Sequence, residues 1–259
     1  MHESDIYSRQ MLFSRIGRAG QDRLACARVA MVGMGGLGSW GAELLARCGV
    51  GYLRLIDCDV VEYSNLARQA MYTRRDADEN IPKVTAAAKR LTEINPSCTV
   101  EPVMARLDAA NAGTLLSAFD VVLDATDDWQ TRFVINSWCV ANNVPWVFGG
   151  VVASVGQVMP IMPHRTACLA CIYDSPPDKP QEQANKASAV GVIGPAVAAV
   201  AALQTAQAVR IITGDKNNST CLFHLDCWDL STQKIVTEKP NPLCRVCGGR
   251  GEMQNECKR

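Results

Sequence analysis

The chain has 259 residues, of which 48% are hydrophobic and 20% charged, the composition of a soluble globular protein with a sizeable core. Its 26 basic and 26 acidic side chains balance, so bulk charge gives no reason to expect nucleic acid or an anionic membrane as a partner. The polar, acidic first residues do not have the pattern of a signal peptide. We therefore expect a cytoplasmic protein with neither kind of partner.

The N-terminal segment, residues 6–24, has a helical pattern and precedes the first apolar run. It predicts a helix that packs on the sheet. On composition alone, Arg9 within it is a solvated side chain.

A glycine-rich turn follows the first apolar run, which ends at Gly33, turns through Gly35 and Gly36 and leads into an Ala- and Leu-rich segment at 40–48. This pattern predicts a strand, a tight turn and a helix whose N-terminus accepts a phosphate. The next apolar strand ends at Asp57, where a carboxylate can meet a ribose hydroxyl. The chain thus begins as a nucleotide-binding βαβ unit. Dinucleotide-dependent dehydrogenases share this fingerprint, so an oxidoreductase remains an alternative.

A polar turn at residues 60–69 lies beyond the end of the second strand, where open α/β sheets place their ligands. Arg68 is positioned there to reach a phosphate, and Asn65 a ribose or phosphate oxygen. Lys83 begins a predicted helix over 83–94. A lysine in the first turn opposes the helix dipole unless an anion lies nearby, which favours a ligand role over a solvated side chain.

The rest of the chain alternates strand and helix patterns, which predicts a doubly wound, mainly parallel, Rossmann-like α/β sheet. A buried strand runs from 120 into an acidic turn at 127–128, and the apolar stretch 187–209 predicts a loop and a buried helix rather than a membrane span. The last two strands look like an antiparallel C-terminal extension. The remaining predicted elements are strand 99–104, helix 109–118, helix 129–142, strands 144–148 and 156–162, a helix ending near 212, and strands 220–225 and 233–237.

Four of the twelve cysteines form two CxxC pairs, Cys168 with Cys171 and Cys244 with Cys247. Four thiolates at this spacing suit a tetrahedral structural zinc, whereas a redox pair would need a thioredoxin-like context that is missing. We expect Zn²⁺ here to tie the C-terminal segment to the middle of the chain, without a catalytic role. The proline-rich segment 173–183 between the pairs predicts a mobile surface loop.

In order along the chain, these motifs resemble the MoeB/ThiF/HesA family, the bacterial relatives of ubiquitin-activating enzymes. The resemblance covers nearly the whole chain and displaces the dehydrogenase reading, which has no use for segment 64–69 or the paired cysteines. The matching segments are Tyr-Ser-Arg-Gln at 7–10, the glycine turn at 33–38, Asp-Cys-Asp at 57–59, Ser-Asn-Leu-Ala-Arg-Gln at 64–69, Pro-Lys at 82–83, Asp-Asp at 127–128, Arg-Phe-Val-Ile-Asn at 132–136, both CxxC pairs and Gly-Val-Ile-Gly-Pro at 191–195.

The resemblance implies adenylation, in which the C-terminal Gly-Gly carboxylate of a small ubiquitin-like sulfur-carrier protein attacks the α-phosphate of ATP and releases pyrophosphate. It implies a homodimer in which Arg9 reaches the ATP of the partner subunit, and Mg²⁺ held by Asp127. Catalysis is assigned to Arg9, Arg68, Lys83 and Asp127. Nucleotide contacts are assigned to Gly33, Gly35, Gly36, Asp57, Asp59, Ser64, Asn65, Leu66, Arg68, Lys83, Asp127 and Asp128.

The implied domain is a single adenylation unit over 1–259, with a nucleotide-binding part to about residue 150 and a part for carrier, zinc and mobile loop after it. Two positions depart from the family pattern. Asp128 stands where Asn is frequent, and Ala187 stands where many members have a cysteine that ThiF-type proteins link to the carrier. Ser188 lacks an activating base and is no substitute. We expect MoeB-like behaviour, with sulfur arriving from another enzyme; a catalytically inactive scaffold is the remaining alternative.

Overall fold

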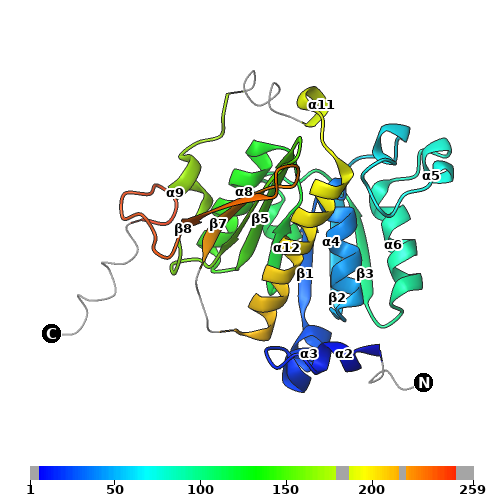
Figure 1. The fold of residues 1–259 in the computed structure, drawn as a ribbon, viewed down its shortest axis with the longest axis horizontal. Helices are drawn as coiled ribbons and strands as arrows, with labels where there is room; N and C mark the ends of the chain where they lie inside the picture. Colours follow the sequence, from blue (N-terminus) through cyan, green and yellow to red (C-terminus); the bar gives the residue numbers. More distant parts are fainter. Residues whose placement is uncertain (1–5, 179–186, 216–219, 249–259) are drawn as a thin grey trace.

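The computed structural model describes residues 6–178, 187–215 and 220–248. Its centre is one eight-stranded sheet in the order β3-β2-β1-β4-β5-β6-β7-β8 (Figure 1). The strands are β1 (Arg28–Val32), β2 (Tyr52–Asp57), β3 (Thr99–Met104), β4 (Val121–Asp124), β5 (Trp146–Val152), β6 (Val155–Ile161), β7 (Cys221–Asp226) and β8 (Ser231–Val236).

The sheet has two parts that differ in strand direction. Strands β3, β2, β1, β4 and β5 pair in parallel, whereas β6, β7 and β8 continue the sheet antiparallel from β5. This confirms a mainly parallel α/β sheet with an antiparallel C-terminal extension. The carboxyl ends of the parallel strands therefore meet along one edge, which we call the carboxyl edge.

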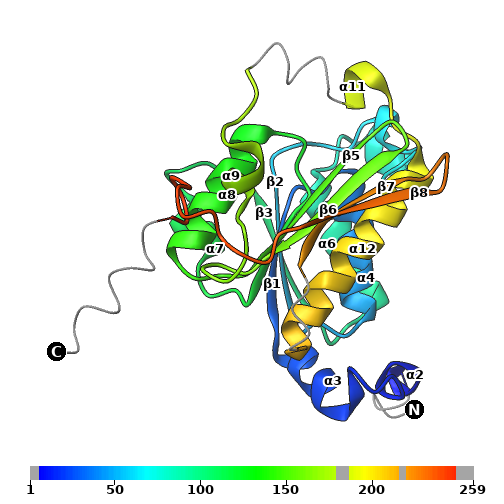
Figure 2. The ribbon, with the colours of Figure 1, turned by 60° about the vertical axis from the view of Figure 1, so that its left-hand side comes forward.

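Helices connect the strands and cover both faces of the sheet, which confirms the doubly wound arrangement (Figure 2). The bounds are α2 (Ser8–Met11), α3 (Gly17–Cys26), α4 (Gly36–Arg47), the 3₁₀ turn η1 (Tyr63–Asn65), α5 (Arg74–Asp78), α6 (Lys83–Ile94), α7 (Ala112–Leu116), α8 (Trp129–Ala141), α9 (Leu169–Tyr173), α11 (Ala187–Val190) and α12 (Gly194–Thr213).

Two apolar cores separate the helices from the sheet. Helices α4, α6 and α12 pack with strand residues such as Met31 and Leu55 on one face. Helices α7, α8 and α9 pack with Ala30 and Val122 on the other. Strands β1 and β4 are apolar on both sides because both sides are covered, as in parallel sheets generally.

Helix α12 is long and apolar enough to cross a membrane by length and composition alone. It packs instead against α4, β5 and β6, and the side chains of Val197, Val200 and Ala201 are buried there. This confirms the predicted buried helix, while residues 187–190, within the stretch predicted to begin as a loop, form the short helix α11.

The predicted helix over 83–94 and strand over 99–104 are confirmed with the same bounds. The N-terminal helical pattern forms two helices rather than one, α2 ending at Met11 and α3 beginning at Gly17, which has a positive φ of 57°. Short helices α5 and α9 were not predicted. In the predicted loop over 173–183, residues 174–178 form neither helix nor strand, and residues 179–183 lie outside the described part.

Candidate functional site

The glycine turn joins β1 to α4 at the carboxyl edge and packs against the backbone that follows β4. Gly33 has a φ of 91°, and a Cβ atom placed on it would lie 2.6 Å from the carbonyl oxygen of Ala125. A Cβ atom on Gly38 would lie 1.9 Å from the carbonyl oxygen of Gly33. Both positions therefore require glycine, because any side chain would push the turn away from β4.

The N-terminus of α4 begins after Gly35, which as the N-cap residue supplies no side-chain cap. Beside it lies Gln69, whose side-chain Nε2 is 3.8 Å from a Cβ atom placed on Gly35. Gln69 is 4% exposed, and its Oε1 has no hydrogen-bond partner among the described residues. Uncapped helix amides and an orphaned polar atom are features that a bound nucleotide would satisfy. The residue-level predictions gave Gln69 no role, although it belongs to segment 64–69.

Asp57, at the end of β2, joins the glycine turn to the acidic turn. One carboxylate oxygen accepts the backbone N–H of Met34 at 2.6 Å, and the other accepts that of Asp59 at 2.7 Å. Burial raises the pKa of Asp57, while these two hydrogen bonds and the charge of Lys83 oppose the shift. Each oxygen retains a second lone pair, so the carboxylate can still accept a ribose hydroxyl.

Lys83 begins α6 and is paired within the protein. Its Nζ donates to Asp59 Oδ2 at 2.8 Å, with the lysine side chain 8% exposed and the aspartate side chain 63% exposed. Burial alone would raise the pKa of Asp59, but the hydrogen bond and charge of Lys83 outweigh it and hold that pKa below its ordinary value. The anion expected near this helix N-terminus is therefore, in part, Asp59 itself.

The loop at 62–69 is shaped by its own hydrogen bonds. Asn65 is 6% exposed, and its Oδ1 accepts the backbone N–H of Glu62 at 3.0 Å in a capping box. The guanidinium of Arg68, half-buried, donates to the carbonyl oxygen of Ser64 at 2.7 Å. Leu66 is half-buried at the C-cap of η1. Asn65 thus fixes the loop that carries Arg68.

The two aspartates after β4 differ in what they contact. Asp127 is exposed at the carboxyl edge. Asp128 is the N-cap of α8, and its Oδ2 accepts the backbone N–H of Thr131 at 2.9 Å and the Thr131 hydroxyl at 2.6 Å. The carboxylate at 128 therefore works as a helix cap, a function that Asn performs equally well.

Arg9 lies at the opposite edge of the sheet. Its neighbour Gln10 donates to the carbonyl oxygen of Cys48 at the C-cap of α4, and Asn95, at the C-cap of α6, donates to the Tyr7 hydroxyl. Helices α4 and α6 both start at the carboxyl edge and have 12 residues each. Arg9 is thus about 18 Å, one helix length, from the other candidate residues of its own chain.

The four paired cysteines come together on the face covered by α8. All four sulfur atoms lie within 4.8 Å of one another, with separations of 3.3 Å between Cys171 and Cys247 and 3.7 Å between Cys168 and Cys244. Thiolates about 2.3 Å from a tetrahedral zinc lie about 3.8 Å apart, so the cluster fits that ion. Asn136, fully buried, donates to Cys168 Sγ at 3.6 Å and accepts the backbone N–H of Leu169, which orients the first pair.

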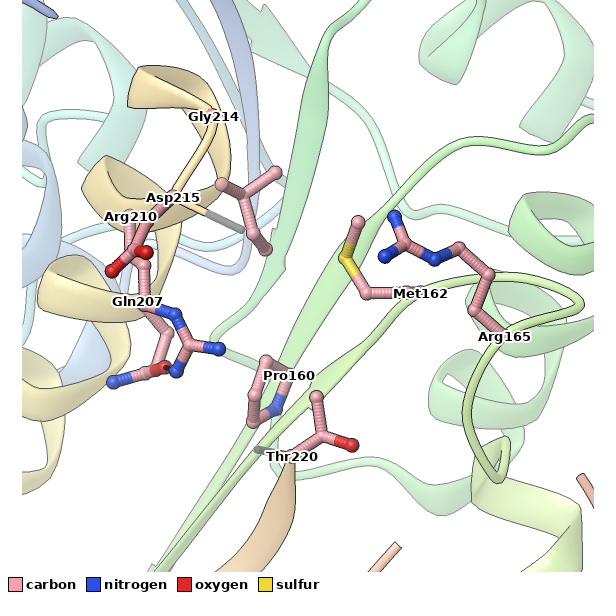
Figure 3. A pocket seen from close by; sticks show the side chains of 9 residues that line it. Pro160, Met162, Arg165, Gln207, Arg210, Gly214, Asp215 and Thr220 are labelled. Carbon is pink, nitrogen blue, oxygen red and sulfur yellow. Dashed lines mark hydrogen bonds between the residues drawn. The ribbon is translucent and has the colours of Figure 1, made fainter. Parts of the chain in front are cut away.

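A cavity of about 160 Å³ lies away from these groups (Figure 3). It is lined by Pro160 and Met162 around the end of β6 and by Asp215 after α12. Because Ile161 pairs with Trp146, the first residue of β5, the cavity lies at the amino end of the parallel strands. It contains none of the predicted site residues.

Comparison with known proteins gives consistent matches over most of the chain. Residues 7–246 match the ThiF family. A "Sulfur carrier protein adenylyltransferase" of Thermus thermophilus is 37% identical over 253 residues, covering 95% of this chain and 91% of that protein. A "SAMP-activating enzyme E1" of Haloferax volcanii is 35% identical over 247 residues, covering 95% and 90%.

Other matches cover less of the relative or show the fold alone. The "Sulfur carrier protein ThiS adenylyltransferase" of Bacillus subtilis is 38% identical over 169 residues, which span 65% of this chain and 50% of that protein. A crystal structure of Escherichia coli MccB with ATP superposes with a TM-score of 0.83 at 23% identity, covering 95% of this chain and 75% of that one. The second similarity supports the architecture described above.

Proposed function

Because the chain belongs to the ThiF family, we propose that it is an ATP-dependent adenylyltransferase that activates the C-terminal Gly-Gly carboxylate of a small sulfur-carrier protein. One observation carries this proposal. The glycine turn after β1, Lys83 beside the end of β2, and Asp127 after β4 meet at the carboxyl ends of three neighbouring strands. Ligands of open α/β sheets bind at this edge.

In the proposed reaction, a carrier carboxylate oxygen attacks the α-phosphorus of ATP. A new oxygen–phosphorus bond forms, and the bond to the β-phosphate breaks as pyrophosphate leaves. The carboxylate is already a nucleophile, so no general base is needed. The protein contributes positioning and neutralisation of phosphate charge.

Residues at the carboxyl edge suit these tasks. The uncapped N-terminus of α4 can donate backbone amides to the phosphates, and Lys83 carries three donors, of which Asp59 takes one. Arg68 can turn from the Ser64 carbonyl to a phosphate oxygen. Asp57 would hold the ribose.

The exposed carboxylate of Asp127 suits Mg²⁺, a hard cation that takes carboxylate and phosphate oxygens. When bound, the ion would neutralise phosphate charge. Zn²⁺ fits the cluster of four cysteine sulfurs, where it would join the segments that contain Cys168 and Cys244.

We propose a homodimer, because Arg9 is too distant to serve the site of its own chain. Arg9 is exposed at the amino ends of the parallel strands, where it would serve the site of a partner subunit. One continuous sheet joins the nucleotide-binding and C-terminal parts, which supports our proposal that the chain acts as one unit. We also propose a cytoplasmic location, in keeping with its similarity to biosynthetic adenylyltransferases.

The experiment is the exchange of labelled pyrophosphate into ATP with a panel of carriers ending in Gly-Gly. We expect exchange that depends on the carrier and disappears when the final glycine is removed. A nicotinamide oxidoreductase would instead show hydride transfer without exchange, and an inactive scaffold would show neither. Exchange without any carrier, or its absence with all of them, would contradict the proposal.

A further inference from the structure

The backbone N–H and C=O of Thr126, the residue directly before Asp127, are both bound by the members of a buried ion pair. Asp124 Oδ1 accepts the Thr126 backbone N–H at 3.0 Å and the Thr126 hydroxyl at 2.7 Å. Arg132 Nη2 donates to the Thr126 carbonyl oxygen at 2.6 Å. The N–H and C=O of one residue are thus bound by two side chains of opposite charge.

The guanidinium of Arg132 has little freedom to move. It also donates to the carbonyl oxygen of Gly149 at 3.3 Å, and its carbon lies 4.9 Å from the ring of Trp129 and 5.1 Å from that of Phe148. The Tyr173 ring packs edge-on against Trp129 at 4.9 Å. The cation is therefore desolvated and enclosed by aromatic rings.

Stability alone is a poor explanation for this pair. The Asp124 side chain is 0% exposed and the Arg132 side chain 9% exposed, and burying such a pair has a desolvation cost that apolar residues would avoid. Arg132 Nε and Asp124 Oδ2 face each other at 3.3 Å, but neither has a hydrogen bond within the described structure. The pair gains directional contacts chiefly with the Thr126 peptide.

We infer that Asp124 and Arg132 are positioning residues that fix the backbone at Thr126, so that Asp127 is held where it can bind the metal ion of the nucleotide. This inference rests on the proposed function. Asp128, the residue after Asp127, is itself held in place because it caps α8. Asp127 therefore lies between two anchored neighbours. Neither positioning residue is among the assigned nucleotide contacts.

The test uses Arg132→Lys, which keeps the charge but cannot reproduce the forked contacts, and Asp124→Ala, which removes the acceptor of the Thr126 N–H and hydroxyl. Arg54→Lys is the matched control. Arg54 pairs with Glu101, donates to the carbonyl oxygens of Thr114 and Leu115 and lies over an aromatic ring, but it contacts no candidate site residue.

Calorimetry measures ATP binding with Mg²⁺ and with EDTA, and hydrogen exchange reports on the backbone at 126–128. We expect Arg132→Lys and Asp124→Ala to weaken ATP binding in Mg²⁺ by about 10- to 100-fold, the cost typical of losing contacts that orient a metal ligand, with binding in EDTA unchanged. Hydrogen exchange of the backbone amides at 126–128 should become faster in both variants. Arg54→Lys should change neither. If one variant fails to fold, the other carries the same test.

Asp127→Ala distinguishes a failure of this inference from a failure of the proposed function. If Asp127→Ala loses the Mg²⁺ effect while both positioning variants keep it, the inference is wrong and the proposed function stands. If Asp127→Ala keeps the effect, the metal assignment fails and the inference with it. Equal losses in Mg²⁺ and EDTA, shared by Arg54→Lys, would show a general structural role and overturn the inference.

Discussion

Lys83 combines two properties that are seldom found together in a lysine, near-complete burial and a position at a helix N-terminus. The side chain is 8% exposed and its ammonium is held by Asp59. Such a buried charge is costly unless it is paired. With two donors left, Lys83 is held ready for a second anion at the carboxyl edge.

Replacing Lys83 or Arg68 by alanine should lower the rate of acyl-adenylate formation by about 10²- to 10³-fold, the loss typical of removing one preorganised donor. Pyrophosphate exchange measures the rate, and circular dichroism checks that Arg68→Ala is folded. Arg75→Ala is the control, because this exposed arginine of α5 forms an ion pair with Glu79 on the same helix. An unchanged rate of pyrophosphate exchange in Arg68→Ala would show that Arg68 is not part of the site.

The Lys83–Asp59 pair also predicts a pH dependence of stability. The pKa of Asp59 is lowered in the folded chain, so its contribution is present above the unfolded pKa of about 3.9 and is lost as the pH falls through the folded value. The difference in unfolding free energy between the natural chain and Asp59→Asn should be constant above about pH 5 and should shrink below about pH 4. Urea unfolding at several pH values measures it. A difference independent of pH would contradict the pairing, and Asp22→Asn, at an exposed carboxylate, is the control.

At the scale of elements, the N-terminus of α8 explains a departure from the family pattern. Asp128 caps the helix through Thr131. Asp128→Asn should leave stability within about 0.5 kcal/mol, whereas Asp128→Ala should cost about 1 kcal/mol. Thermal unfolding measures both. Equal losses would show that the charge, rather than the cap, matters at this position.

Much of the local structure was predictable because its signals lie within short stretches of sequence. Pro82 before Lys83 marks the start of α6, and the glycines after Val32 mark the turn into α4. Helix α9 has five residues and two of the four clustered cysteines flank or lie within it, so its formation depends on packing that no local pattern reports.

The arrangement of the site was predictable in outline only. The carboxyl ends of parallel strands meet by topology, which places Asp57 and Asp127 at one edge. The Lys83–Asp59 pair and the hydrogen bonds of Asp124 and Arg132 to Thr126 join separate segments, and no spacing rule specifies them. The same is true of the burial that leaves Gln69 Oε1 without a hydrogen bond in the described part of the chain. Asp124 belongs to the predicted strand from 120 and Arg132 to the predicted helix over 129–142, and neither pattern indicates that the two side chains meet.

At the scale of the whole molecule, the cysteine cluster joins α9 to a segment more than 70 residues later in the chain. If it holds Zn²⁺, a strong chelator should lower the melting temperature and release about one zinc per chain. Cys171→Ser should reproduce the loss of metal, whereas Cys26→Ser, at an exposed cysteine outside the cluster, should not. A chain that contains no zinc when purified without chelators would overturn the assignment.

The central claim is that a carrier carboxylate attacks the α-phosphate of ATP. The most direct measurement uses a carrier whose C-terminal carboxylate is labelled with oxygen-18, with hydroxylamine to trap the activated acyl group at carbon. We predict the carrier hydroxamate together with AMP that contains one labelled oxygen, because the attacking oxygen remains on phosphorus. Unlabelled AMP, or ADP as the only product, would contradict the account.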